Sequence, residues 1–186
     1  ASRGALDIDG MGEEIVSRLV ESGRVADVAD YYSLSEEELA SLDMGRVKAD
    51  GESVRLGHTV AKKLVAAIEA SKGRTFARVL FGLGIRHVGK SVGEVIAERF
   101  LSIDKLVLAS EEDIAECEGI GPKIAASVKQ FLAVPENLAV LERLRQAGLS
   151  LEVDLGAAHA QAAADAGVAG ELADAQPLAG LTFVLT

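Results

Sequence analysis

The chain has 186 residues, 49% of them apolar, and a net charge of −10 from 19 Lys and Arg against 29 Asp and Glu. This length and apolar fraction predict one or two domains with a sizeable core and exclude a disordered chain. Its single cysteine, Cys117, excludes an intramolecular disulfide framework and a Cys-rich zinc site. The longest apolar-or-glycine run, residues 79–85, is far shorter than the roughly 20 residues of a membrane span. Acids follow the first residues where a secretory signal would be apolar, so we expect a cytoplasmic protein without a membrane partner.

Charge is unevenly distributed along the chain. Residues 55–90 contain eight basic residues and one acid, Glu69, whereas the stretches on either side are net acidic. Because a partner responds to the local field and not to the sum, the acidic total does not exclude nucleic acid. The basic stretch is either a solvated helix face or a phosphate-binding stripe.

Helical periodicity runs through residues 1–152. Apolar residues recur at helical spacing within residues 15–20, 60–68, 92–100, 124–131 and 138–144. Ser35 with Glu38 predicts a capping box, Ser102 and Ser110 predict helix starts, and Pro122 suits a first helical position. No convincing alternating strand precedes residue 150. We therefore expect an all-α domain over residues 1–152.

The composition changes after this region. Residues 153–176 are dominated by Ala, are interrupted by Gly and contain no Lys or Arg, which predicts a linker. Residues 177–186 (PLAGLTFVLT) are β-branched and aromatic and predict the first strand of a further domain, truncated here. A lone strand cannot bury itself, so we expect the chain to be a fragment of a longer protein.

A short turn pattern recurs four times, each time before an apolar-periodic stretch. The four turns are Gly10-Met11-Gly12, Arg55-Leu56-Gly57, His87-Val88-Gly89 and Gly119-Ile120-Gly121. The last glycines of the final three turns lie 32 residues apart, and the segment 42–45 offers a further turn 33 residues after Gly12. The simplest account is a period of 32–33 residues with an insertion, residues 46–57, that we expect to be a polar surface loop.

Each repeat predicts a short helix, a tight turn and a second helix that begins directly after the glycine. The central apolar residue fills the space between the helices, and the glycines leave the backbone bare. The first amides of a helix lack intrahelical partners and, with the helix dipole, favour an anion. Repeated sites of this kind suit successive phosphates of a nucleic acid, without sequence preference. A helical scaffold that only binds other proteins is the alternative.

The four segments resemble the helix-hairpin-helix motif, a DNA-binding unit without sequence specificity. The whole run is similar to the C-terminal half of the bacterial NAD-dependent DNA ligase family, and residues 177–186 resemble the start of that family's BRCT domain. The strings that carry the resemblance are 6–12 (LDIDGMG), 66–72 (AAIEASK), 80–89 (LFGLGIRHVG), 118–122 (EGIGP), 135–137 (PEN) and 144–148 (LRQAG). A hairpin domain from another DNA repair protein is a further alternative, against which residues 177–186 argue.

The resemblance implies both a function and an absence. Those ligases seal nicks in duplex DNA during replication and repair, through a lysine that takes AMP from NAD. Neither that lysine motif nor the family's four-cysteine zinc module is in this sequence, so we expect no catalytic and no metal-binding residue here. NAD, a divalent metal (Mg or Mn) and a structural Zn would all bind upstream. The implied partners are nicked double-stranded DNA and the rest of the ligase chain, with the protein a monomer in the bacterial cytoplasm, at the nucleoid.

The predicted DNA-binding residues are those of the turns and the basic side chains beside them. They are Gly10, Gly12, Gly57, His58, Lys62, Lys63, Arg86, His87, Val88, Gly89, Lys90, Gly119, Ile120, Gly121 and Lys123. Glu13 and Glu14 directly follow the first turn, where they would repel a phosphate. We therefore expect the second and third turns to hold DNA most strongly, the fourth less, and the first to be chiefly structural. Asp7 and Asp9 are expected to be helix caps and Cys117 a core residue.

Overall fold

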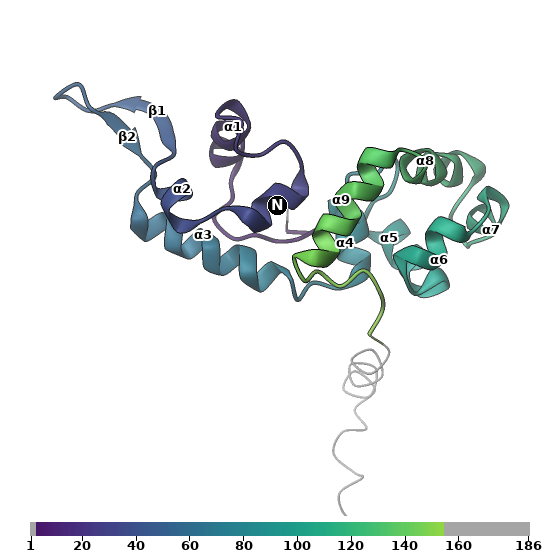
Figure 1. Ribbon diagram of the computed structural model, residues 1–186. Coiled ribbons are helices and arrows are strands. Elements are labelled where there is room, and N and C mark those ends of the chain that lie inside the picture. The colour runs from purple at the N-terminus through teal and green to yellow at the C-terminus, as the bar shows by residue number, and fades with distance from the viewer. Residues whose placement is uncertain (1–2, 155–186) are drawn as a thin grey trace, which may run out of the picture. The chain divides into compact units, whose positions relative to one another are not determined.

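The structure is a computed structural model that describes residues 3–154. The remainder of the predicted linker and the predicted strand at 177–186 lie outside these residues. In chain order the elements are α1 (Glu13–Glu21), the 3-10 helix η1 (Val28–Ser33), α2 (Glu36–Ala40), β1 (Asp43–Val47), β2 (Ser53–Arg55), α3 (His58–Ser71), α4 (Phe76–Gly82), α5 (Lys90–Phe100), α6 (Ile103–Leu108), α7 (Glu111–Ala115), α8 (Pro122–Leu132) and α9 (Pro135–Gln146) (Figure 1).

Side-chain caps begin several helices where the sequence predicted them. The Ser35 hydroxyl accepts from the Glu38 amide (3.2 Å), and the Glu38 carboxylate accepts from the Ser35 amide (2.8 Å), which closes a capping box before α2. Ser102 caps α6, Ser110 caps α7, and Pro122 is the first residue of α8. These predictions are confirmed. They could be made from the sequence because a cap depends only on residues within one turn of it.

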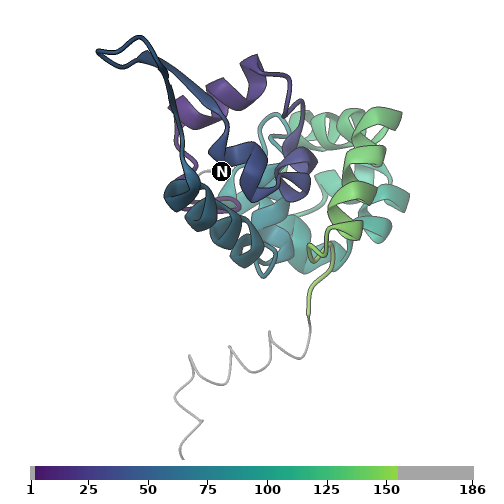
Figure 2. The ribbon, with the colours of Figure 1, turned by 60° about the vertical axis from the view of Figure 1, so that its left-hand side comes forward.

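A two-stranded antiparallel sheet lies between α2 and α3, where the sequence predicted a polar loop. Strands β1 and β2 pair Asp43 with Arg55 and Val47 with Ser53, with an irregular register between these pairs. Met44 is the only buried residue of β1, so the strand carries no alternating apolar signal. The prediction of an all-α domain is therefore wrong at this hairpin, which we call the β-ribbon (residues 43–55). In Figures 1 and 2 the β-ribbon projects away from the helices.

Within the described residues, three helix pairs surround the core. Helix α2 packs on α3, α4 on α5, and α7 on α8, while α9 packs on α8 and η1. Phe76, Ile96, Cys117 and Val128 are buried members of one apolar cluster, which confirms Cys117 as a core residue. No single described helix is long and apolar enough to span a bilayer; α8 and α9 reach that length and composition only together, with a 77° bend between them.

An ion-pair network joins α9 to the N-terminal part of the chain. The Arg143 guanidinium of α9 donates to the carboxylates of Asp27 and Asp30, which lie at the start of η1. Amides of Asp27 and Ala26 also donate to Asp30, and together with Arg143 they lower the pKa of that carboxyl group. The network therefore links residues that are more than a hundred positions apart in sequence.

The first predicted hairpin lacks a helix before its turn. Residues 3–6 form turns, and only α1 follows Gly12 as a helix. Asp7 has a φ of 53° and accepts from Arg74 (3.0 Å), and no side chain caps α1, so the predicted role of Asp7 and Asp9 as helix caps is wrong. The other three predicted hairpins have a helix on both sides.

Candidate nucleic-acid interface

The first, third and fourth turns share one backbone conformation. In each, the central residue donates from its amide to the carbonyl three positions earlier: Met11 to Ile8, Val88 to Ile85, and Ile120 to Cys117, at 3.0–3.2 Å. The residue before the central one has a positive φ, which is 79° at Gly10, 68° at His87 and 74° at Gly119. Met11, Val88 and Ile120 are buried, as predicted for residues that fill the space behind the turn.

The helix after each turn begins without a side-chain cap. Gly12, Gly57, Gly89 and Gly121 are the N-cap residues of α1, α3, α5 and α8, and no side chain of the described residues accepts from their first amides. The first intrahelical bond of α5 runs from the Gly93 amide to the Gly89 carbonyl (2.9 Å), which leaves the amides between them directed outward. These helix starts therefore offer N–H groups that another molecule can bind.

Nothing inside the described chain explains three of these four glycines. Gly12, Gly89 and Gly121 have φ values of −75°, −95° and −88°, which any residue can adopt. A Cβ built on any of them would meet no atom of the described residues within 4 Å. Neither conformation nor internal packing therefore requires glycine here, and the absent side chains leave room for an external group to approach the backbone. Gly57 differs, because its φ of 83° favours glycine.

The second turn departs from the other three. The Leu56 amide donates to the Leu42 carbonyl and the Gly57 amide to the Ala40 carbonyl, each at 3.0 Å. These bonds close the base of the β-ribbon directly before α3. The predicted start of α3 after Gly57 is confirmed, but the compact turn is replaced by the β-ribbon.

Exposed basic side chains surround the bare starts of α3, α5 and α8. Lys62 and Lys63 are exposed on α3, Arg86 precedes α5, and Lys123 lies in the first turn of α8. None of these four side chains forms a hydrogen bond or ion pair with the described residues. Lys90, the first residue of α5, is also exposed and lies 3.8 Å from Glu94. These cations are therefore available to an anionic partner.

The side chains of two histidines on the predicted list are also exposed. His58 begins α3 and its Nδ1 lies 3.3 Å from the Glu36 carboxylate of α2. His87 occupies the left-handed position that Gly10 and Gly119 occupy in the matching turns. A non-glycine residue in this conformation costs roughly 1–3 kcal/mol, so the third turn holds an imidazole at the tip against a backbone preference.

Two arginines of the basic stretch are structural and not part of the exposed surface. Arg78 donates from Nε to the Ala5 carbonyl (2.8 Å) and from its other end to the Arg3 carbonyl, while Arg74 donates to the Leu6 carbonyl (3.3 Å). Both lie close to Asp7 as well. The sequence grouped them with the phosphate-binding candidates, but in the structure Arg78 joins residues 3–7 to α4, and Arg74 joins them to the segment before α4.

Arg78→Ala should reduce stability without a direct loss of DNA contacts. The change removes a charged donor from two backbone carbonyls, and such hydrogen bonds contribute about 1.5–3 kcal/mol each at most. We expect the free energy of unfolding, measured with urea, to fall by about 1–2 kcal/mol. Lys63→Ala is the matched control: because this side chain is exposed and without a described partner, its loss should leave stability unchanged and weaken DNA binding. The reverse pattern would contradict this division of the basic residues.

The start of α1 is acidic, as the sequence indicated. Glu13 and Glu14 lie in its first turn and are exposed. Glu14 forms an ion pair with Arg46 of the β-ribbon (2.9 Å), a residue that the sequence placed in a polar surface loop. The first turn is therefore partly occupied by charges from the chain itself.

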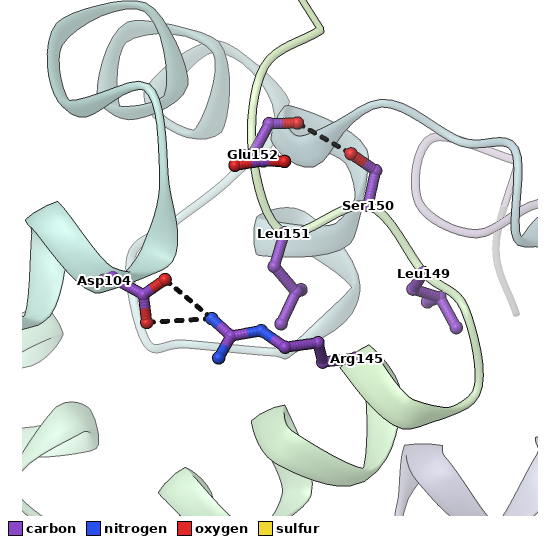
Figure 3. Close-up of a pocket in the computed structure, with 6 residues that line it drawn as sticks. All are labelled: Asp104, Arg145, Leu149, Ser150, Leu151 and Glu152. Carbon is purple, nitrogen blue, oxygen red and sulfur yellow. Dashed lines mark hydrogen bonds and ion pairs between the residues drawn. The ribbon is translucent and has the colours of Figure 1, made fainter.

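A pocket of about 190 Å³ lies between α6, α9 and the segment after α9 (Figure 3). Arg145 donates to both Asp104 oxygens across it at 2.8 Å, and the Ser150 hydroxyl donates to the Glu152 carbonyl at 2.7 Å. The ion pair therefore already occupies the charged groups of Arg145 and Asp104. The pocket shares no residue with the bare helix starts, so it is not part of the candidate interface.

The described residues offer no ligand set for a metal. No group of three or more His, Cys, Asp or Glu side chains converges within residues 3–154. Cys117 is buried and donates weakly to the Asp113 carbonyl (3.6 Å).

Comparisons with known proteins agree with this geometry. A SAM-like helix-hairpin-helix tandem family matches residues 2–51, and a helix-hairpin-helix motif family matches residues 78–141. The DNA ligase of Brevibacillus brevis is 41% identical to this chain over 185 residues, which are 100% of the chain and 24% of the relative. This chain belongs to the helix-hairpin-helix region of the DNA ligase family.

Two further relatives extend the comparison. The DNA ligase of Chlorobaculum parvum is 45% identical over 152 residues, or 82% of this chain and 21% of the relative. The DNA ligase of a Synechococcus species is 43% identical over 189 residues, or 100% of this chain and 25% of the relative. The chain thus spans about a quarter of the length of the curated relatives it matches.

Proposed function

We propose that this chain binds duplex DNA without sequence preference, as the part of an NAD-dependent DNA ligase that holds the nicked duplex. The observation that carries the proposal is the set of bare helix starts. Three N-cap glycines have no conformational or packing reason to be glycine, and their open side is where a backbone phosphate could approach. A protein-binding scaffold would account for the packed helix pairs but not for these open glycines.

The charges beside each helix start allow the four starts to be ranked by expected phosphate affinity. The start of α5 is flanked by Arg86 and Lys90, and the start of α3 by Lys62 and Lys63 on the following turn. At α8 the first residue, Pro122, has no N–H, and the acids Glu116 and Glu118 precede the turn. We propose that α5 and α3 bind phosphate most strongly, α8 less, and α1 least.

The reaction itself is proposed to take place elsewhere in the ligase. NAD, the divalent metal and the structural zinc would be bound by residues outside this chain. The chain itself would act as a part of a cytoplasmic, monomeric enzyme during replication and repair. The residues at 177–186 would begin the BRCT domain. By itself the chain would neither react with NAD nor seal a nick; a mass increase by one AMP after incubation with NAD would refute this.

Binding to a nicked duplex should depend strongly on salt. Each neutralised phosphate releases counterions, so the logarithm of affinity should fall with the logarithm of salt concentration by about 0.9 per phosphate contact. Fluorescence anisotropy with several random duplexes of equal length measures both the slope and any sequence preference. A flat salt dependence, or discrimination among these duplexes, would contradict backbone recognition.

Gly89→Asp tests the bare helix start directly. The new carboxylate would accept from the first amides of α5 as a good cap, so the helix should be as stable as before or slightly more stable. The same carboxylate occupies the phosphate position, and we expect about fivefold weaker DNA binding from a charge interaction of this kind. Gly12→Asp makes the identical change at a matching turn that is already acidic, and it should alter affinity by less than about twofold. Equal losses from both variants would refute the proposed ranking.

A further inference from the structure

The β-ribbon occupies the tip of the second helix pair. It connects α2 to α3, and its base lies directly before the bare start of α3 at Gly57. Figures 1 and 2 show that it extends beyond the helices in both views. At the corresponding place the third and fourth pairs have only a compact turn. If the ends of the pairs face the duplex, the β-ribbon is the element that reaches furthest along it.

The outer end of β1 combines an exposed apolar side chain with two cations. Val47 is 68% exposed, although strand residues of this type are usually half-buried. Its chain neighbours Arg46 and Lys48 have side chains that are 63% and 53% exposed. Elements that enter a DNA groove frequently present such an apolar residue beside cations, because the apolar group contacts the bases while the cations contact phosphates.

The two cations beside Val47 are held by weak, solvent-exposed ion pairs. Arg46 pairs with Glu14 of α1 (2.9 Å), and Lys48 pairs with Glu52 across the ribbon (2.9 Å). Exposed pairs of this kind contribute little, so a phosphate can replace the carboxylate partner. The β-ribbon has as many acids as bases, three of each, so its attraction depends on where the charges lie and not on their sum.

We propose that the β-ribbon is an additional contact with duplex DNA, in which Val47 lies against the groove and Arg46 and Lys48 against the flanking phosphates. The inference rests on the proposed DNA-binding function and extends it to an element outside the repeated turns. The β-ribbon lies close to α1, because a Cβ at Gly45 would collide with the Arg18 guanidinium. On binding, Arg46 exchanges the Glu14 carboxylate for a phosphate.

Val47→Asp tests the contact, because an exposed side chain can be changed without disturbing the core. We expect about fivefold weaker binding of the full chain to a nicked duplex, the scale of one adverse exposed charge interaction. Leu108→Asp is the matched control: it makes the same apolar-to-acid change at a side chain of α6 that is 86% exposed and outside the helix pairs. It should change affinity by less than about twofold.

Removal of the competing acid provides a second, opposite readout. Glu14→Gln releases Arg46 for the phosphate and should strengthen DNA binding. Glu21→Gln is the control, which should not strengthen binding, because it removes the same charge from the other end of α1, where Glu21 pairs with Arg18. Hydroxyl-radical footprinting should show a shorter protected stretch of DNA with Val47→Asp, because protection is lost at one end of the footprint only. Lys90→Glu should instead weaken protection inside the footprint.

The outcomes separate the two proposals. If the chain binds DNA and Lys90→Glu weakens it, while Val47→Asp matches Leu108→Asp and leaves the footprint unchanged, the β-ribbon contact is refuted and the DNA-binding function stands. If the unaltered chain does not bind duplex DNA at all, the proposed function is refuted, and the β-ribbon contact with it.

Discussion

Lys90→Glu should weaken binding of this chain to a nicked duplex by about tenfold. Lys90 is the first residue of α5, directly after Gly89, and its side chain is 69% exposed. The variant loses an attractive interaction with phosphate and gains a repulsive one, each roughly 0.5–1 kcal/mol at an exposed site. The loss should be largest at low salt, because counterions screen exposed charges.

The same change should leave the fold intact. A glutamate at a helix start interacts favourably with the helix dipole, by about 0.3–1 kcal/mol. Its repulsion from Glu94 at i+4 costs a similar few tenths of a kcal/mol, so the two effects largely cancel. Circular dichroism should therefore show unchanged helical content.

Glu13→Lys is the companion measurement at the first turn. It places a cation beside Gly12, where the chain now has two acids, and should leave affinity unchanged or increase it. Titrations of both variants against the same duplex decide the matter. If Lys90→Glu binds as well as the unaltered chain, the basic residues around α5 are only a solvated face.

The features that the sequence predicted correctly depend on near neighbours in the chain. The capping box of Ser35 and Glu38, the caps at Ser102 and Ser110, and the helix starts after the four glycines each involve residues within one turn. The burial of Val88 and Ile120 follows from the same repeat, since an apolar residue between two helices has nowhere else to lie. Local pattern was therefore sufficient to find the bare helix starts.

The features that the sequence missed depend on distant partners or on an irregular register. Arg74 and Arg78 bond to carbonyls of residues 3–6, about seventy positions away, and nothing near them in sequence distinguishes them from the exposed Lys62 or Lys63. The β-ribbon has a single buried residue in β1 and an irregularity between its paired residues, so alternation did not indicate it; the hairpin signal that the sequence does contain is Asp50-Gly51 in the loop between the strands. An isolated hairpin of this size is stable only when it packs on something else, here α1.

We expect DNA binding to depend on the geometry of the α4–α5 pair as well as on charge, and a substitution at Gly93 separates the two contributions. Gly93 is buried in α5, and a Cβ built there would lie 2.9 Å from the Ala77 carbonyl oxygen and 3.7 Å from the Phe81 amide of α4. The obstacle is backbone and not a flexible side chain, so α4 and α5 must move apart to accept a larger residue. The close approach of α4 and α5 therefore requires glycine at position 93.

Gly93→Val should destabilise the protein by about 2 kcal/mol, in the range for overpacking a well-packed contact. The better helix propensity of valine returns only a few tenths of a kcal/mol of this loss. Urea unfolding measures the change, and Ser91→Val, at an exposed position of the same helix, is the control that should have almost no effect on stability. Because Gly93→Val leaves every basic residue in place, its folded fraction should also bind DNA more weakly if the turn at His87–Gly89 must be held in its present conformation. Undiminished affinity per folded molecule would mean that charge alone, without the geometry of the α4–α5 pair, is sufficient for binding.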